Sequence, residues 1–376
     1  KLVYIDPPFD VGADFSAEIE IGDETFSKEA NVLEEIAYRD TWGAGSDSFL
    51  QMIYERLSLI SGLLSPNGSI FVHCDHRVNS YLRLIMDELF GENNFVNSIS
   101  WKRSLPHGNA FNRFGQIIDT IHFYKRSENS LWNPQFAKYS DKAIEKAYRY
   151  VEEGTGRRFQ TISCLAPNKD RPNLKYEWNG VHSTWRFTKE RMKRMDEENL
   201  LFDSKTGVAR YKMYLDEAKG VPVQDLWDDI TLLLGNSKEA VGYPTQKPEA
   251  LLERIIKAAT NKGDIVFDFF AGSGTTAAAA EKLGRKWICS DLGKFSIHTT
   301  RKRLIGVQRE LKKKGEDYRA FEVLNLGKYE SDYFVSGLES QDGATEDQKE
   351  RNRDLAFNTL ILQAYEAEPV EGFMTF

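Results

Sequence analysis

The sequence predicts an α/β domain built around a mostly parallel sheet, with a second, irregular domain inserted into it. Two blocks, residues 1–126 and 243–330, alternate apolar runs of strand length with amphipathic runs of helical spacing. Residues 127–242, between these blocks, are aromatic, basic and much less regular. We therefore expect one sheet made from two sequence blocks. Residues 331–376 are predicted to be a linker and the start of a further C-terminal region.

The first block opens with a predicted strand at residues 2–5, and Asp-Pro-Pro-Phe follows at 6–9. Two consecutive prolines cannot donate to a sheet or continue a helix, so they fix a loop at the strand's end. Residues 10–40 are polar and acidic, which predicts a long loop or hairpin near a site. Helices are expected from Ser46 to residue 64 and over 78–90, and strands over 69–75, 95–101 and 117–124.

The second block contains the run Asp-Phe-Phe-Ala-Gly-Ser-Gly-Thr-Thr at residues 268–276. A strand-like run precedes it at 263–267, and strong helix formers follow it to the glycine at 284, so the motif is a strand, a turn and a helix. The next predicted strand ends in Asp291, 19 residues beyond Gly272. This spacing suits a nucleotide site in which glycines admit the ligand and the acid binds ribose hydroxyls.

Two features that the motif lacks limit the kinds of ligand that this turn could bind. The third glycine of a dinucleotide fingerprint is absent, and no Lys-Ser/Thr pair follows as it does in a phosphate-binding loop. A ligand with adenosine but no phosphate, S-adenosylmethionine (SAM), therefore fits the motif best. An ordinary tight turn with an unrelated acid downstream is the alternative.

The remaining elements of the second block are simpler. Pro248 suits the first turn of a helix over 249–259. A further helix is expected around 295–304 and a last strand over 321–324. The chain starts inside a predicted strand without an initiator Met, which suggests a piece of a longer protein.

Charge and composition limit the classes of protein to which the chain can belong. The net charge of −7 argues against a simple nucleic-acid binder, but residues 101–220 contain 23 Lys/Arg and 15 Asp/Glu. A basic middle segment set in an acidic body is therefore expected. Three widely spaced cysteines indicate a reducing compartment. No apolar run has membrane length, and no His/Cys cluster has metal-site spacing, so we expect neither a membrane nor a metal partner.

The two motifs in this order resemble those of the β-class amino-methyltransferases of DNA. In that family an (Asp/Asn/Ser)-Pro-Pro-(Tyr/Phe) motif comes first, a target-recognition region follows, and a SAM-binding Phe-x-Gly-x-Gly motif comes last. The resemblance covers nearly all of residues 1–330. Residues 246–248, Gln-Lys-Pro, also look like a family motif, and residues 227–230, Trp-Asp-Asp-Ile, resemble a stretch of the Mod subunits of type III restriction systems. The resemblance implies a Rossmann-like SAM-dependent methyltransferase fold with a circularly permuted motif order.

The first residue of the Pro-Pro motif implies the target. Aspartate implies methylation of adenine N6, whereas serine would have suggested cytosine N4. The amino group of a flipped-out adenine would then bind the Asp6 carboxylate and the Pro7 carbonyl, while Phe9, in place of the family's commoner Tyr, stacks on the base. The predicted catalytic residues are Asp6, Pro7, Pro8 and Phe9. The predicted cofactor-binding residues are Asp268, Phe270, Ala271, Gly272, Ser273, Gly274, Thr275, Asp291 and Lys247.

The implied partners are double-stranded DNA and either a restriction subunit or a second copy of the chain, in the prokaryotic cytoplasm and associated with the nucleoid. Two alternatives stay open: a SAM-dependent methyltransferase acting on RNA, and a DNA-binding fragment without activity of its own. His73 and His76 are expected to be structural. Phosphate contact and a solvated loop are equally weighted for Lys102, Arg103, His107 and Arg113.

Overall fold

The computed structural model describes residues 1–8, 17–21, 24–28, 46–106, 112–203, 207–233, 237–243 and 245–325. The chain divides into two compact units, Lys1–Tyr318 and Arg319–Phe376. The elements described below all lie in the first unit. Phe9 and residues 331–376, for which the sequence gives predictions, lie outside the described residues.

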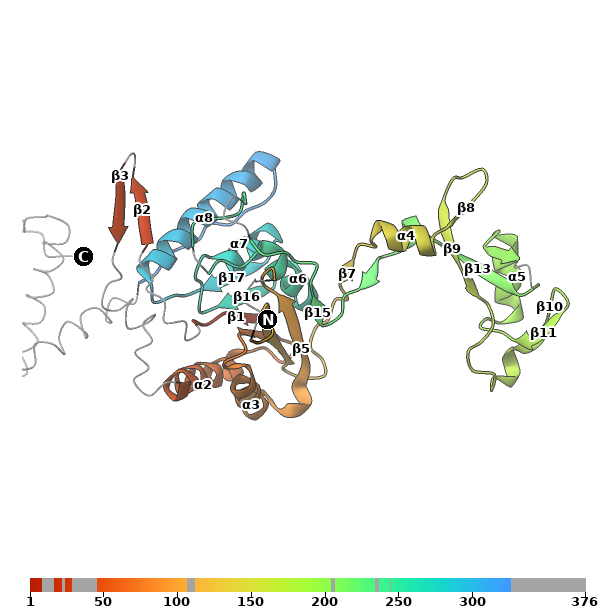
Figure 1. Ribbon diagram of the computed structural model, residues 1–376, viewed down its shortest axis with the longest axis horizontal. Coiled ribbons are helices and arrows are strands. Elements are labelled where there is room, and N and C mark those ends of the chain that lie inside the picture. Colours follow the sequence, from red (N-terminus) through yellow and green to blue (C-terminus); the bar gives the residue numbers. More distant parts are fainter. Residues whose placement is uncertain are drawn as a thin grey trace, which may run out of the picture. The chain divides into compact units, whose positions relative to one another are not determined.

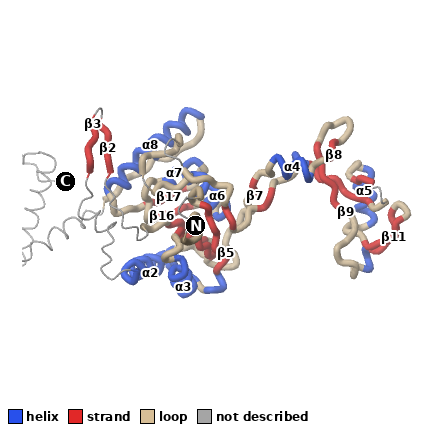
Figure 2. Tube along the Cα trace, in the orientation of Figure 1, coloured by secondary structure: helices blue, strands red, loops and turns tan. Residues whose placement is uncertain are grey.

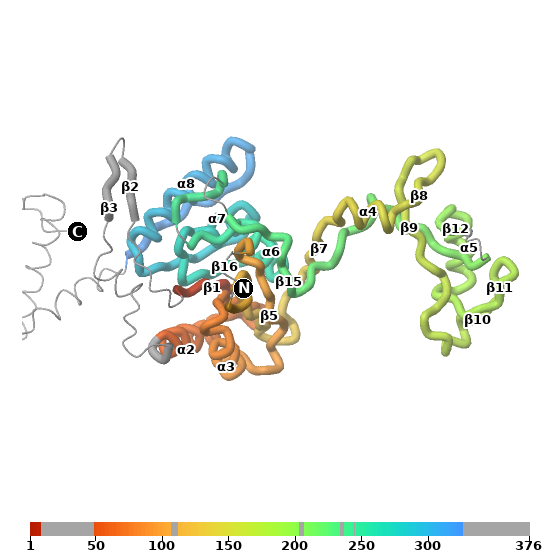
Figure 3. The backbone as a smooth tube through the Cα atoms, in the orientation of Figure 1, coloured from red at the N-terminus to blue at the C-terminus, as the bar shows by residue number. Residues whose placement is uncertain are grey.

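The described residues of the first unit form a mixed seven-stranded sheet in which β6 runs opposite to its neighbours. The mostly parallel sheet predicted from the sequence is thereby confirmed. The two sequence blocks meet at its centre, where β1 pairs in parallel with both β4 and β16, and Figure 3 shows the first strand of the chain beside much later ones. In sheet order the strands are β15 (Leu226–Trp227), β5 (Phe95–Lys102), β6 (Ile118–Lys125), β4 (Ser69–Cys74), β1 (Leu2–Ile5), β16 (Ile265–Asp268) and β17 (Lys286–Cys289).

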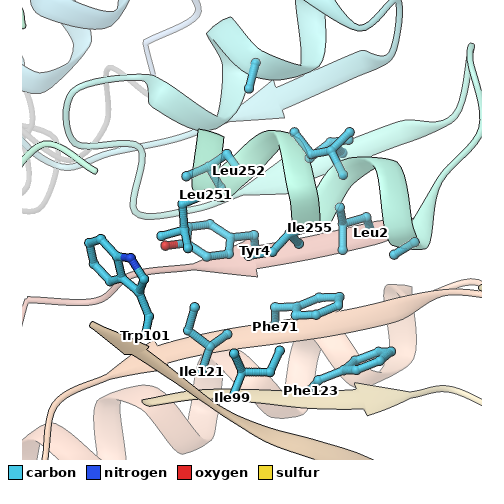
Figure 4. Close-up of a cluster of buried hydrophobic side chains, with 14 of the residues drawn as sticks. Leu2, Tyr4, Phe71, Ile99, Trp101, Ile121, Phe123, Leu251, Leu252 and Ile255 are labelled. Carbon is cyan, nitrogen blue, oxygen red and sulfur yellow. The ribbon is translucent and has the colours of Figure 1, made fainter. Parts of the chain in front are cut away.

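Helices cover both faces of this sheet, as Figures 1 and 2 show. α2 (Ser46–Leu63) and α3 (Asn79–Phe90) pack on one face against Val3 and Ile5. α6 (Glu249–Ala259) packs on the other face against Leu2 and Tyr4, which alternate with them along β1. Figure 4 shows this second face, with Tyr4 between the α6 leucines and Phe71. β1 is therefore buried on both sides, as its uninterrupted apolar sequence predicts.

Two helices follow the glycine-containing turn. α7 (Thr275–Lys282) begins directly after Gly274, and α8 (Lys294–Lys314) follows β17. α8 is longer than the helix expected around 295–304 because buried side chains continue to Leu311, and Gly315, in the left-handed conformation, ends it. Residues 321–324 are not the predicted strand: no strand pairs there, and Val323 and Leu324 are exposed.

The segment between the two blocks has its own small sheets and core. Trp178 and Trp185 are buried there and belong to its hydrophobic core. Its strands are β7 (Phe136–Ala137), β8 (Tyr150–Val151), β9 (Arg158–Ser163), β10 (Lys175–Trp178), β11 (Val181–Thr184), β12 (Leu201–Asp203), β13 (Ala209–Tyr214) and β14 (Val221–Pro222), with helices α4 (Asp141–Ala147) and α5 (Lys189–Glu197).

The borders of this segment differ in detail from the range 127–242. β15 pairs with β5, so the chain rejoins the main sheet at Leu226. Near the other border, the Asn133 backbone N–H donates to the carbonyl of Ala258 in α6. The remaining elements are the 3₁₀ turns η1 (Glu92–Asn94), η2 (Pro172–Leu174) and η3 (Leu215–Glu217), and the hairpin of β2 (Ala17–Ile21) and β3 (Glu24–Lys28), which falls in the predicted loop or hairpin of residues 10–40.

Candidate active site

The two sequence motifs meet at one edge of the sheet. β1 and β16 are adjacent and parallel, with Val3 opposite Phe267, so their carboxyl ends lie side by side. Asp6 directly follows β1, and Asp268 is the last residue of β16. In open α/β sheets, ligands bind at this edge, outside the carboxyl ends of the strands. Residues more than 260 positions apart thus share one candidate site.

The turn after β16 is built around the buried carboxylate of Asp268. Its Oδ1 accepts a hydrogen bond from the Phe270 N–H at 3.0 Å, and its Oδ2 accepts one from the Thr276 hydroxyl. Burial raises the pKa of Asp268 to about 7, and the nearby carboxylates of Asp6 and Asp291 add to this rise, against the lowering effect of both hydrogen bonds. Asp268 therefore holds the backbone of the turn at Phe270 and the first turn of the following helix at Thr276.

Two glycines give the turn its path. Gly272 and Gly274 have φ values of +51° and +73°, which L-residues with a Cβ rarely adopt. A Cβ on Gly274 would also lie 2.6 Å from the hydroxyl oxygen of Thr300 in α8. Gly274 therefore lets α8 pack tightly beneath the turn. The ring of Tyr243, which stacks on Phe295, would lie 3.6 Å from a Cβ on Gly272.

Asp291 is joined directly to the turn. Its Oδ2 accepts the Gly272 N–H at 2.8 Å, and its Oδ1 accepts the Gly293 N–H at 2.9 Å. Since each carboxylate oxygen has two lone pairs, these bonds are compatible with the predicted contacts to ribose hydroxyls. The turn thus has the close backbone approach and the adjacent acid that SAM requires. Asp291, Gly272 and Gly274 would hold its adenosine part.

Thr275 links the turn to Lys247. The Thr275 hydroxyl donates to the Lys247 carbonyl at 3.1 Å, and it accepts from Arg303 at 2.9 Å. Arg303 in turn pairs with Glu249, which also pairs with Lys282. Burial raises the pKa of Glu249, but the bonds from Lys282 and Arg303 outweigh it and leave the pKa below its usual value. This cluster locks α6, α7 and α8 together behind the turn.

The two carboxylate oxygens of Asp6 have different surroundings. Its Oδ2 forms an ion pair with the Lys247 ammonium group. Its Oδ1 is buried and has no hydrogen-bond partner among the described residues. An unsatisfied buried acceptor is costly, so this oxygen is suited to a donor from a ligand. Lys247 was predicted to bind the cofactor, which stays a prediction. Its carbonyl accepts from Thr275, and its ammonium group pairs with Asp6.

Pro7 is buried and Pro8 half-buried in the loop after β1, where the sequence predicts them to hold the carbonyl groups rigid. The predicted contact between the Pro7 carbonyl and a base stays a prediction. Phe270 and Ala271 lie in the turn, where the Ala271 N–H donates to the Ser290 carbonyl and ties the ends of β16 and β17 together. The Ser273 hydroxyl lies 3.0 Å from that of Thr275.

A network of polar side chains behind Asp6 was not predicted from the sequence. His73, expected to be structural because no partner carboxylate could be placed, lies 3.2 Å through Nε2 from Asp119. Its Nδ1 lies 3.0 Å from the Tyr4 hydroxyl and 3.9 Å from Asp6 Oδ1. The signal was present as period-2 alternation: in the observed strand pairing, Tyr4 and Asp6 share a face with His73, and so does Asp119. Alternation alone does not say which strands are neighbours, so the sequence could not show that these side chains meet.

Other singled-out residues have simpler surroundings. Asp75 accepts hydrogen bonds from the Arg77 backbone and side chain, so it stabilises the turn before α3. Arg103 forms an ion pair with Asp119 at 3.0 Å, while its side chain stays 42% exposed. His107 lies outside the described residues. Among those that are described, no helix is long and apolar enough to cross a membrane, and no cluster of His, Cys, Asp or Glu could hold a metal ion.

Comparison with known proteins gives the family of this site. A family model described as DNA methylase, covering N6 and N4 enzymes, matches residues 1–302. The chain belongs to this DNA methylase family. The match includes both the Asp6 loop and the turn after β16, so the resemblance stated from the sequence is confirmed.

Two curated relatives share the same fraction of identical residues with this chain. The type II methyltransferase M.EcaI of Enterobacter cloacae is 30% identical over 307 residues, covering 81% of this chain and 64% of the relative. The StyLTI Mod subunit, from a type III restriction-modification enzyme of Salmonella typhimurium, is 30% identical over 308 residues, covering 76% and 47%. The chain thus spans between about half and two thirds of these relatives. A solved M1.HpyAVI–SAM complex is 19% identical with a TM-score of 0.40, covering 81% of this chain and 87% of that one.

Proposed function

We propose that this chain carries the catalytic part of a DNA methyltransferase that moves a methyl group from SAM to N6 of adenine in a specific sequence. The observation that carries the proposal is the buried Asp6 Oδ1, which lacks a hydrogen-bond donor among the described residues. It lies at the same sheet edge as the glycine turn that would hold SAM. An exocyclic amino group of a base supplies the missing donor.

The adenine assignment rests on the residue type at position 6. An amino group on an aromatic ring is a poor nucleophile because its lone pair is delocalised into the ring. A carboxylate that accepts one N–H bond, with the Pro7 carbonyl accepting the other, favours a pyramidal nitrogen whose lone pair points at the methyl group. SAM, when bound, supplies this methyl group as a sulfonium substituent. The Mod subunits to which the chain is similar belong to type III restriction-modification enzymes, which also supports the assignment.

Lys247 has a second task in this proposal. By pairing with Asp6 Oδ2, it fixes which carboxylate oxygen faces the base and balances part of its negative charge. Asp6 orients the amino group and stabilises charge, and it is positioned to take up the departing proton. A base inside a duplex cannot reach such an edge, so the target adenine is flipped out, at a cost of a few kcal/mol.

We propose that the segment between the two blocks recognises the DNA. Its helix α5 carries Lys189, Arg191, Lys193 and Arg194 around two buried methionines, so these charges surround a helix anchored to the segment's own core. A restriction subunit or a second copy of the chain is the proposed protein partner, by similarity to Mod subunits. The proposed location is the bacterial cytoplasm, on chromosomal DNA.

The test is direct transfer of label. The protein is incubated with tritiated SAM and duplex DNA, and the DNA is digested to nucleosides and separated. Label in N6-methyladenine supports the proposal, and Asp6→Ala should abolish it. Label in N4-methylcytosine would overturn the adenine assignment, and label in RNA alone would overturn the DNA assignment. SAM binding without any transfer by the whole protein would favour a DNA-binding subunit.

A further inference from the structure

The buried chain of polar groups behind Asp6 has no task in the reaction described so far. It runs from Tyr4 and Asp6 at the end of β1, through His73 in β4, to Asp119 in β6 and Arg103 after β5. His73 is fully buried, with its ring edge-on to the Trp101 ring at 5.6 Å. Figure 4 shows Tyr4 and Trp101 on the same side of the sheet. The imidazole is thus held in one orientation with a carboxylate on each side.

The hydrogen bonds define which nitrogen of His73 carries its proton. Asp119, paired with Arg103, can only accept, so Nε2 carries the N–H that points to it. Burial, together with the charges of Asp6, Asp268 and Asp119, raises the pKa of Tyr4 well above its usual value, so the Tyr4 hydroxyl keeps its proton. It therefore donates to Nδ1. The lone pair of His73 lies on the side of Asp6.

We propose that His73 receives the proton that leaves the target amino group, by way of Asp6 Oδ1. The inference rests on the proposed methyl transfer. His73 acts through Asp6 and is a positioning residue, because it does not touch the base itself. Asp6 Oδ1 lies 3.9 Å from Nδ1, so it must approach by about 0.7 Å to reach hydrogen-bonding distance. The terminal torsion of an aspartate is broad, which allows movement of this oxygen.

The step balances in atoms and charge. The bond between N6 and the methyl carbon forms as the bond between that carbon and the sulfonium sulfur breaks. One N6–H bond breaks, Asp6 Oδ1 takes the proton, and Nδ1 of His73 then receives it while Asp6 returns to the carboxylate. The Tyr4 hydroxyl turns a lone pair towards the new N–H. The positive charge lost from sulfur therefore ends on an imidazolium between Asp6 and Asp119.

The charges around His73 favour this end state. Asp6 faces Nδ1, and Asp119 faces Nε2, so the cation has a carboxylate on each side. Arg103 pairs with Asp119, and Lys247 pairs with Asp6, and these cations offset part of that attraction from farther away. Next to His73 along the chain are Cys74, the last residue of β4, and Asp75. Burial raises the pKa of the Cys74 thiol, so this group stays neutral.

A matched control is available in the same sheet. His122 in β6 is also buried and bonded through both ring nitrogens, to the Ser98 hydroxyl at 3.0 Å and the Asn79 carbonyl at 2.9 Å. Both of these bonds lead away from Asp6, and His122 lies on the opposite face of β6 from Asp119. His122→Gln therefore tests what loss of a buried histidine does to the sheet in general.

The first measurement needs neither SAM nor DNA. In protein labelled with ¹⁵N-histidine, nuclear magnetic resonance resolves the tautomer of each of the six imidazoles, and His73→Gln identifies the His73 signals. The hydrogen bonds predict the tautomer that carries its proton on Nε2 and accepts at Nδ1. A proton on Nδ1 in the resting protein would overturn the inference, because the receiving lone pair would already be occupied.

The second measurement is the single-turnover rate of methyl transfer across pH. His73→Gln keeps a donor for Asp119 but has no basic nitrogen, so we expect a rate loss of about 100-fold with SAM affinity unchanged. The dependence of the rate on pH should differ between the wild type and His73→Gln, because only the wild type has a basic side chain at this position. His122→Gln should keep both the rate and the pH profile.

The outcomes separate this inference from the function on which it rests. A wild-type protein that transfers no methyl group removes both. Wild-type transfer together with an unchanged rate and pH profile in His73→Gln removes the inference alone. Equal losses in His73→Gln and His122→Gln would also remove it, since they would report damage to the sheet rather than loss of a proton acceptor.

Discussion

Replacing Gly274 by alanine tests whether the turn is shaped by its contact with α8. The new Cβ would lie 2.6, 2.8 and 2.9 Å from three atoms of Thr300, all closer than real Cβ contacts allow. Thr300 cannot turn away freely, because it is β-branched, only 7% exposed, and its hydroxyl bonds the Gly272 carbonyl. The turn or α8 must therefore shift.

The expected loss of unfolding free energy in Gly274→Ala has two parts. A side chain at φ +73° costs about 1–2 kcal/mol, offset by about 0.4–1 kcal/mol from the less flexible unfolded chain. Overpacking against Thr300 adds about 1–3 kcal/mol. Gly315, which ends α8, has φ +71°, and a Cβ added there would meet nothing within 4 Å, so Gly315→Ala carries the first part alone. Gly274→Ala should therefore be the more destabilising change by about 1–3 kcal/mol.

Urea unfolding, followed by circular dichroism, measures both free energies of unfolding. Thr300→Ala removes the two nearest clashing atoms, so it should be less costly in the Gly274→Ala protein than in the wild type by about 1 kcal/mol. SAM affinity, measured by calorimetry, should fall in Gly274→Ala and stay unchanged in Gly315→Ala. Equal stabilities for the two alanine variants would show that Thr300 does not constrain the turn, and the reasoning would fail.

Three further predictions concern the candidate site. Asp291→Ala removes the acceptor of the Gly272 N–H, so it should weaken SAM binding by about 10–100-fold in calorimetry. Asp6→Ala should leave SAM binding nearly intact. Equal losses of affinity in the two variants would make Asp6 part of the cofactor site. The folded pKa of Asp268 is raised, so its contribution to stability is complete below about pH 4 and is lost as the pH rises through 7. Relative to Asp268→Asn, the wild type should lose about 2–3 kcal/mol of unfolding free energy between pH 5 and 8, and parallel curves would contradict this. Glu249→Ala should cost about 3–5 kcal/mol in urea unfolding by leaving Arg303 buried without its carboxylate, and a neutral result would show that the cluster is dispensable.

The sequence alone was sufficient for the local elements and for the two motifs. Alternating apolar runs, the Pro-Pro stop after β1 and the glycines around α7 are local signals, and each acts within a few residues. Residues 321–324 show the limit of such signals, since a strand also needs a partner strand, and none pairs there.

The tertiary structure alone decided which side chains meet. Strand order places β1 between β4 and β16, and this order depends on pairings between residues far apart in the sequence. It brings His73 and Lys247 to the carboxylate of Asp6, although they lie 67 and 241 positions away from Asp6 in the sequence. The sequence therefore determined the chemistry that each motif carries. Long-range strand pairing determined that Asp6 has one oxygen held by Lys247 and the other buried beside His73.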